Sequence, residues 1–248
     1  MPDQPSVPVA ETLAATHGAA AVRPFAAAAA AAAAEAADQA PRATAGPADG
    51  TPAASRKRPK PGERRVQILQ TLAGMLEQPG ADRITTAALA ARLQVSEAAL
   101  YRHFASKAQM FEGLIEFIET SVFSLVNQIT EREAGGAVQA HRIVAMLLQF
   151  GEKNPGMTRV MVGDALVFEH ERLTARMNQF FDRLEAQLRQ CLRSAADGDG
   201  SPTPTVDAQA RASALTAFTV GRLQRYARSG FKRAPTEHLD FALARLAG

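Results

Sequence analysis

In the last three-quarters of the chain, large apolar residues recur every three or four positions, which is the spacing of one face of an α-helix. The first such run, from Val66 to Leu76, is followed by the helix-ending pair Pro79-Gly80. A longer run after Lys107 carries one apolar stripe, formed by Phe111, Ile115, Ile118, Val122, Leu125 and Ile129. These runs predict amphipathic helices rather than strands.

Further helical runs follow a polar break after residue 132. One covers residues 143–150 and ends where Asn154 can cap, and Pro155 can start, the next helix. The next two, separated by a loop at residues 197–205, carry Leu173, Met177, Phe180, Leu184, Leu188 and Cys191, and then Leu215, Phe218, Leu223 and Tyr226. An aromatic content of 6% without Trp argues against a β-sandwich, so the predicted class is all-α.

Between the first two runs, residues 83–107 read RITTAALAARLQVSEAALYRHFASK, which predicts a helix-turn-helix. Thr85 or Thr86 can cap its first helix, Ser96 its second, and Ser106 the helix that follows. The turn lacks a Gly, so we expect Gln94 to carry strain of about 1 kcal/mol. The apolar positions, expected on the inside, are Ile84, Leu89, Leu93, Val95, Leu100 and Phe104.

The outward side of this corner suits DNA. Glu97 can accept a hydrogen bond from cytosine, and Ala98 lets the helix sink into the major groove. The residues expected to contact bases or phosphates are Thr85, Thr86, Ser96, Glu97, Ala98, Tyr101, Arg102, His103 and Lys107. A small helical corner within a core is the alternative, but it would not need three long polar side chains and Lys107 on one side.

The charge is uneven along the chain. The formal net charge is +3, residues 1–54 contribute −3, and the remainder is therefore +6. Residues 1–55 are rich in Ala and Pro with few large apolar side chains, so we expect a disordered tail. The basic arm after it begins with Arg56, Lys57 and Arg58 and includes Arg64 and Arg65; it can bind phosphates or the minor groove, or be a solvated linker.

The motif LYRHFASK, after a Thr-led helix and a V-S turn, resembles the DNA-binding signature of TetR-type regulators. A closer resemblance, from about Arg64 to the C-terminus, is to the nucleoid occlusion factors of this family, through MFEGLIEFIE, FGEKNPGMTR and RLEAQLRQCLR. It implies a homodimer on palindromic double-stranded DNA in the cytoplasm, associated with the nucleoid. It also implies action on the tubulin-like division protein FtsZ when DNA-bound.

The same resemblance divides the chain and implies further contacts. Residues 1–55 are the tail, 56–107 the basic arm and DNA-binding domain, and 108–248 a helical domain for dimerisation and partner binding. The implied partner contacts are Phe117, Lys153 and Asn154, for which core packing and a simple helix-helix turn are the alternatives. The implied dimer contacts are Phe180, Leu184, Leu188, Leu215 and Phe218.

A ligand-responsive TetR-type repressor is the alternative function, and it would need a pocket with convergent polar groups. We expect no enzyme, because no metal-ligand spacing, phosphate loop or nucleophile elbow occurs. No cofactor or metal is expected. Glu169-His170-Glu171 is expected on a solvated face, and the only cysteine, Cys191, is expected in the core. No apolar run is long enough to span a membrane.

Overall fold

The computed structural model describes residues 62–78, 83–198 and 200–246, and within these ranges it contains helices and no β-strand. The all-α prediction is confirmed. The tail, residues 1–55, and the arm residues Arg56, Lys57 and Arg58 lie outside the described residues. The helices are α2 (Glu63–Leu76), α3 (Thr86–Arg92), α4 (Glu97–Tyr101), α5 (Lys107–Arg132), α6 (Gly136–Lys153), α7 (Pro155–Met161), the 3-10 helix η1 (Asp164–Leu166), α8 (Glu171–Gly198), α9 (Pro204–Arg228) and α10 (Leu239–Leu246).

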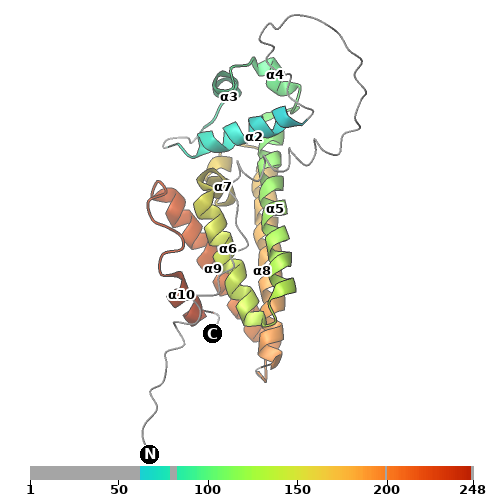
Figure 1. Ribbon diagram of the computed structural model, residues 1–248, viewed down its shortest axis with the longest axis vertical. Coiled ribbons are helices and arrows are strands. Elements are labelled where there is room, and N and C mark those ends of the chain that lie inside the picture. The colour runs from blue at the N-terminus through green and yellow to red at the C-terminus, as the bar shows by residue number, and fades with distance from the viewer. Residues whose placement is uncertain (1–61, 79–82, 199, 247–248) are drawn as a thin grey trace, which may run out of the picture.

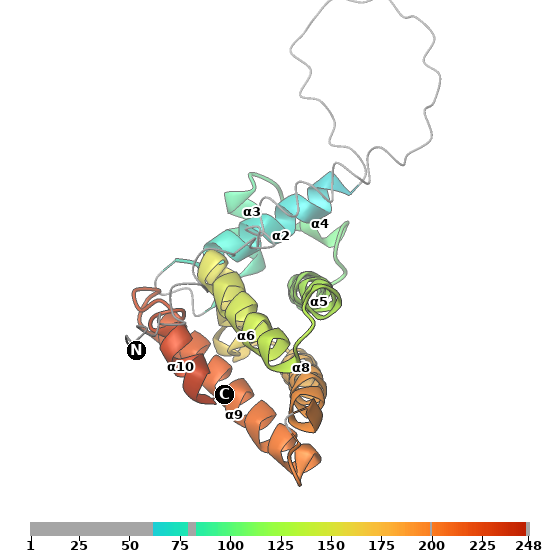
Figure 2. The same ribbon diagram turned by 60° about the horizontal axis from the view of Figure 1, so that its bottom comes forward.

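Four long helices, α5, α6, α8 and α9, form an elongated body, and α2 crosses one end of it with α3 and α4 beyond (Figure 1). The short α7 lies beneath α2, and α10 lies on the outside of the body near α9. In Figure 2, where α5 is seen nearly end-on, the head formed by α2, α3 and α4 lies to one side of the body helices. Because α5 begins in the head and runs down the body, it joins the two parts.

The apolar stripes of the long helices meet in one core. On α5, Phe111, Ile115, Ile118 and Val122 are at most 1% exposed. Leu125 and Ile129, toward the end of the helix, are half-buried against the same core. Burying a Leu, Ile or Phe side chain stabilises a fold by about 1.5–3 kcal/mol, so this stripe fixes how α5 sits in the body.

The apolar stripes of α8 and α9 also face the core, which corrects the predicted dimer contacts on both helices. Phe180, Leu184, Leu188 and Leu215 are between 0 and 2% exposed within one subunit, so they cannot reach a second copy. Only Phe218 is half-buried. A stripe at helical spacing identifies a buried face but not what covers it. Here α8 buries that face against α6 and α9.

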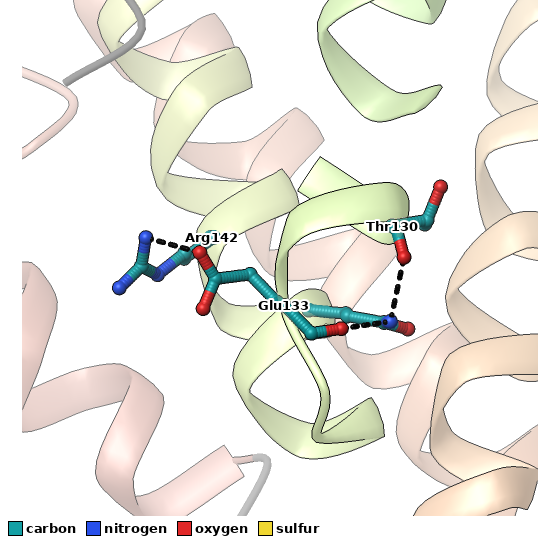
Figure 3. A network of polar contacts seen from close by, with 4 residues as sticks. Thr130, Glu133 and Arg142 are labelled. Atoms are coloured by element: carbon teal, nitrogen blue, oxygen red, sulfur yellow. Dashed lines mark hydrogen bonds and ion pairs between the residues drawn. The ribbon is translucent and has the colours of Figure 1, made fainter. Parts of the chain in front are cut away.

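The turn between α5 and α6 is held by a polar network at the end of the body far from the head (Figure 3). The Gln139 amide donates to the carbonyl oxygens of Thr130 and Glu133 at 3.2 and 2.7 Å. The Glu133 carboxylate pairs with Arg142 at 2.5 Å (Figure 3). The two hydrogen bonds from Gln139 satisfy carbonyl groups that the end of α5 leaves without helical partners.

The head is docked on the body through α2 and α7. A Cβ atom at Gly156 would lie 2.2 Å from the carbonyl oxygen of Ala73, so the two backbones approach as only glycine permits. Glu77, just after α2, accepts a hydrogen bond from the Gly156 amide, which lowers the pKa of its carboxyl. Burial raises that pKa by more, and the net shift is upward. The orientation of the head therefore depends on this junction.

Candidate DNA-binding interface

The corner between α3 and α4 is a helix-turn-helix whose turn is closed by two backbone hydrogen bonds. Gln94 has a positive φ of 56°, as the absence of glycine from the turn predicted. Its amide donates to Ala91, and the Val95 amide donates to Ala90 at 3.0 Å, the bonding pattern of a Schellman motif. The corner is therefore set by the backbone and only tolerated by the side chain at position 94.

Side-chain caps begin α3, α4 and α5, as the sequence predicted. The hydroxyl oxygen of Thr85 accepts from the Ala88 amide at 3.1 Å, and that of Ser96 accepts from Ala99 at 3.3 Å. Ser106 caps α5 by accepting from the Gln109 amide at 3.2 Å. Each such cap is worth about 1 kcal/mol, and the cap at Ser96 fixes where the recognition helix α4 begins.

Beneath the corner lies the predicted apolar interior. Ile84, Leu89, Leu100 and Phe104 are at most 6% exposed. Leu93 and Val95 are half-buried and pack against the same core. The interior prediction is confirmed.

The outward side of α4 presents a small polar surface. Glu97, Ala98, Arg102 and His103 are exposed, and Tyr101 is 46% exposed. The Thr86 hydroxyl donates to the Glu97 carboxylate at 2.6 Å, so two predicted DNA contacts from different helices orient each other. This surface can offer base edges the carboxylate of Glu97 and the methyl group of Ala98. Tyr101, Arg102 and His103 add hydrogen-bond donors on side chains of different length.

The basic arm is shorter than predicted, because Arg64 and Arg65 belong to α2. The guanidinium of Arg65 lies over the Phe104 ring at 4.1 Å and donates to the carbonyl oxygen of His103 at 2.8 Å. Arg64 donates to Gln67 on its own helix at 2.7 Å. Arg65 thus positions the end of α4 rather than extending toward a phosphate. Sequence analysis counts the charge of Arg65, but it cannot show that the guanidinium stacks on Phe104.

Lys107 has a carboxylate partner from the body. Its ammonium group pairs with Glu169, just before α8, and lies 5.7 Å from the centre of the Phe111 ring. The Glu169 side chain is only 9% exposed, so the expectation of a solvated face at this position is wrong. The sequence separation of 62 residues hid this contact. The phosphate contact of Lys107 stays a prediction, and it would have to compete with Glu169.

Two further ion pairs continue down the seam between α5 and α8. Arg172 pairs with Glu112 at 2.8 Å. Arg176 donates twice to Glu119, at 3.0 and 2.5 Å, and this hydrogen bonding is the main reason why the pKa of Arg176 is raised. Exposed pairs are individually weak, but a bidentate Arg-carboxylate pair is directional. The row links α5 to α8 along their seam.

The three predicted partner contacts have different environments. Phe117, on α5, is half-buried with its ring centre 6.5 Å from that of Phe150 on α6. Lys153, at the end of α6, is exposed. Asn154 is 3% exposed, and its amide donates to the carbonyl of Phe150 at 2.8 Å. Asn154 therefore holds the end of α6, which corrects its assignment as a partner contact. It occupies the position before α7 with Pro155 first in that helix, as predicted, but its side chain makes no capping hydrogen bond to α7.

In the described ranges, no group of three or more His, Cys, Asp or Glu side chains gathers in a way that could hold a metal ion. Cys191 is buried as predicted, and burial raises the pKa of its thiol. None of the helices in these ranges is long and apolar enough to cross a membrane.

Comparison with known proteins assigns both parts of the chain. Residues 68–114 match the family described as bacterial regulatory proteins, tetR family, and residues 136–246 match the tetracyclin repressor-like C-terminal domain. The chain is 52% identical over 178 residues to the nucleoid occlusion factor SlmA of Photobacterium profundum, covering 71% of this chain and 90% of that protein. It is 50% identical over 177 residues to the protein of the same name from Idiomarina loihiensis, with the same coverage of both chains.

Solved structures share the fold at low sequence identity. The TetR family transcriptional regulator PfmR from Thermus thermophilus superposes with a TM-score of 0.59 at 20% identity, over 73% of this chain and 98% of that one. The fatty acid degradation regulator FadR from Bacillus halodurans gives 0.61 at 13% identity, over 77% and 97%. The arrangement of a three-helix head on a helical body is thus common to chains whose sequences have diverged widely.

Proposed function

The chain belongs to the family of the nucleoid occlusion factor SlmA, and from that premise we propose that it binds palindromic DNA as a homodimer and, once bound, opposes assembly of an FtsZ ring over the nucleoid. DNA would then both localise the protein and activate it. The protein would act in the cytoplasm at the nucleoid, where its binding sites are.

The observation that carries the DNA part is the surface of α4. The helix begins at the cap made by Ser96, and Glu97, Ala98 and Tyr101 are exposed on it. A carboxylate and a methyl group suit base edges in the major groove, and Arg102 suits a phosphate. Two such heads related by a two-fold axis would read a palindrome.

The dimer in this proposal uses the outer faces of α8 and α9. Most of the predicted dimer residues lie in the core of the subunit and cannot serve. On its outer face, α9 exposes small side chains at Ala210, Ala214 and Ala217, beside the half-buried Phe218. Small side chains let helices of two subunits approach closely, and the two heads would be held at a fixed separation. That fixed separation is what allows DNA to set the orientation of both heads.

For FtsZ we propose a surface that includes Phe117 and Lys153, at the head-proximal ends of α5 and α6. The surface would combine a half-buried aromatic ring on α5 with an exposed cation on α6, residue types that are common in binding anchors. Because α5 also carries the head, DNA binding can change the affinity of this surface by fixing how α5 is oriented. Asn154 would contribute by shaping the end of α6.

The deciding experiment measures binding of purified FtsZ with and without a short duplex selected from random DNA by the protein itself. We expect binding that the duplex strengthens. The double variant Phe117→Ala/Lys153→Ala should keep its affinity for the duplex and lose FtsZ. A matched control, Val138→Ala/Arg132→Gln, changes one exposed apolar residue and one cation at the far end of the body and should behave as wild type.

Absence of FtsZ binding in both conditions would reject the division role and leave a ligand-responsive repressor. That alternative predicts a small molecule that stabilises the protein to heat and releases the duplex. The DNA part is tested separately, because Arg102→Gln should lower the slope of log affinity against log salt by about one unit. An unchanged slope would remove Arg102 from the phosphate contacts.

A further inference from the structure

A second basic surface lies away from the helix-turn-helix, where α9 ends and the chain turns toward α10. It lines an open hollow of about 750 Å³. Arg222 and Arg225 contribute from α9, and Lys232 and Arg233 from the loop that follows. The hollow has room for a small molecule, and its lining is dominated by charge.

These four cations are poorly neutralised. Within the described part of the chain, none of them forms an ion pair with a carboxylate, and Arg222 instead lies 5.0 Å from the centre of the Phe218 ring. Two carboxylates are nearby. Glu237 lies 3.7 Å from His238, and Glu152 accepts the hydroxyl of Thr236 at 2.6 Å. Four cations gathered against two carboxylates leave a positive potential that an anion would relieve.

The dipole of α9 explains only part of this arrangement. Arg225 lies in the last turn, where a cation is favourable for any helix. Lys232 and Arg233 come after the helix, so they need another explanation. Their backbone amides both donate to the hydroxyl oxygen of Ser229, at 3.1 and 2.9 Å. The backbone that carries these two cations is therefore held close to the end of α9.

The same loop contains a residue in an unfavourable conformation. Phe231 has a φ of 65°, which a side chain other than glycine rarely adopts. Its ring centre lies 5.2 Å from that of Tyr226, and the Tyr226 hydroxyl donates to the carbonyl oxygen of Glu152 at 3.0 Å. These contacts anchor the loop to the end of α6. A loop held in one conformation by its neighbours is suited to presenting fixed cations.

We propose that this hollow binds two or more phosphate groups at once. Arginine forks match the geometry of phosphate oxygens, and a lysine adds a mobile point charge. The concave shape and the near absence of large apolar residues in the lining favour a free, multiply phosphorylated small molecule over an apolar effector. This role is separate from DNA reading and from the proposed action on FtsZ.

The test uses the full chain saturated with its selected short duplex, so that phosphate sites in the head are already filled. Inorganic tripolyphosphate is titrated into the complex by calorimetry. We expect one site per subunit, and at least tenfold weaker binding in Arg225→Gln/Lys232→Gln. The control Arg132→Gln/Arg245→Gln removes the same charge from exposed helix positions elsewhere and should bind as wild type.

Affinity for the duplex is measured first for every variant, so a defect in DNA binding is recognised separately. A second arm replaces tripolyphosphate by vesicles with and without phosphatidylglycerol. Binding only to the anionic vesicles, with the same dependence on Arg225 and Lys232, would assign the phosphates to lipid headgroups. Equal binding of both double variants, or no binding in either arm, would overturn the proposal.

Discussion

Gln94 is the residue at which the head accepts local strain to make its corner. Its φ of 56° lies in the region that glycine adopts freely, and the two amides of the turn are already bonded. We expect Gln94→Gly to raise the free energy of unfolding by about 0.5–1 kcal/mol, since relief of backbone strain exceeds the added entropy of the unfolded chain. Chemical denaturation measures this directly.

The matched control is Gln190→Gly, at an exposed position inside α8. There, a glycine should lower the free energy of unfolding by about 1 kcal/mol, because no strain is relieved. Similar effects at both positions would show that the strain at Gln94 is negligible. The strain could be predicted from sequence because a tight turn between two capped helices has few backbone solutions. The position of Arg65 could not be predicted from sequence, since its stacking on Phe104 depends on tertiary contact.

At the scale of elements, the junction of α2 and α7 has no room for a side chain at Gly156. A Cβ there would lie 2.2 Å from the Ala73 carbonyl oxygen, and backbone cannot move aside as a flexible side chain can. We expect Gly156→Ala to lower the free energy of unfolding by about 1–3 kcal/mol. It should also weaken DNA binding, because the displaced α2 carries the recognition helix with it.

Gly74, on the same helix α2, is the control for that junction. Nothing lies within 4 Å of a Cβ at this position, so Gly74→Ala should stabilise the protein by about 0.5–1 kcal/mol and leave DNA binding unchanged. If Gly156→Ala kept wild-type stability and affinity, the junction would not fix the head. The sequence contains both glycines with equal prominence, and only the packing distinguishes them.

Helix positions and the caps at Thr85, Ser96 and Ser106 were predictable because the periodicity and capping rules are local. Which surface covers the apolar face of a helix was not predictable. The stripe of α8 was assigned to a dimer, although Leu184 and Leu188 are 0% exposed inside one subunit. Periodicity alone cannot distinguish a subunit's own core from a partner's surface. The short α10 was also not predicted. In the structure, His141 on α6 contacts the Leu243 carbonyl at 3.0 Å, which holds α10 against the body.

At the scale of the whole molecule, the ammonium group of Lys107 has two candidate partners. In the structure it pairs with Glu169 of the body, and the sequence assigns it to a DNA phosphate. If both hold, Glu169→Gln should strengthen DNA binding several-fold by releasing Lys107, measured by fluorescence anisotropy. In a Lys107→Ala background the same substitution should have no effect. A gain that persists without Lys107 would mean that Glu169 acts through general repulsion of DNA.

The outer faces of α8 and α9 decide whether two heads can act together. Ala217 is exposed on α9, on the side away from Leu215, and a long cation there would separate two closely packed helices. We expect Ala217→Arg to convert the dimer to a folded monomer, measured by light scattering, and to weaken palindrome binding at least tenfold. The control Ala244→Arg places the same charge at an exposed position of α10 and should leave the dimer intact. A dimer that survives Ala217→Arg would move the interface elsewhere, and the fixed separation of the heads would then need another cause.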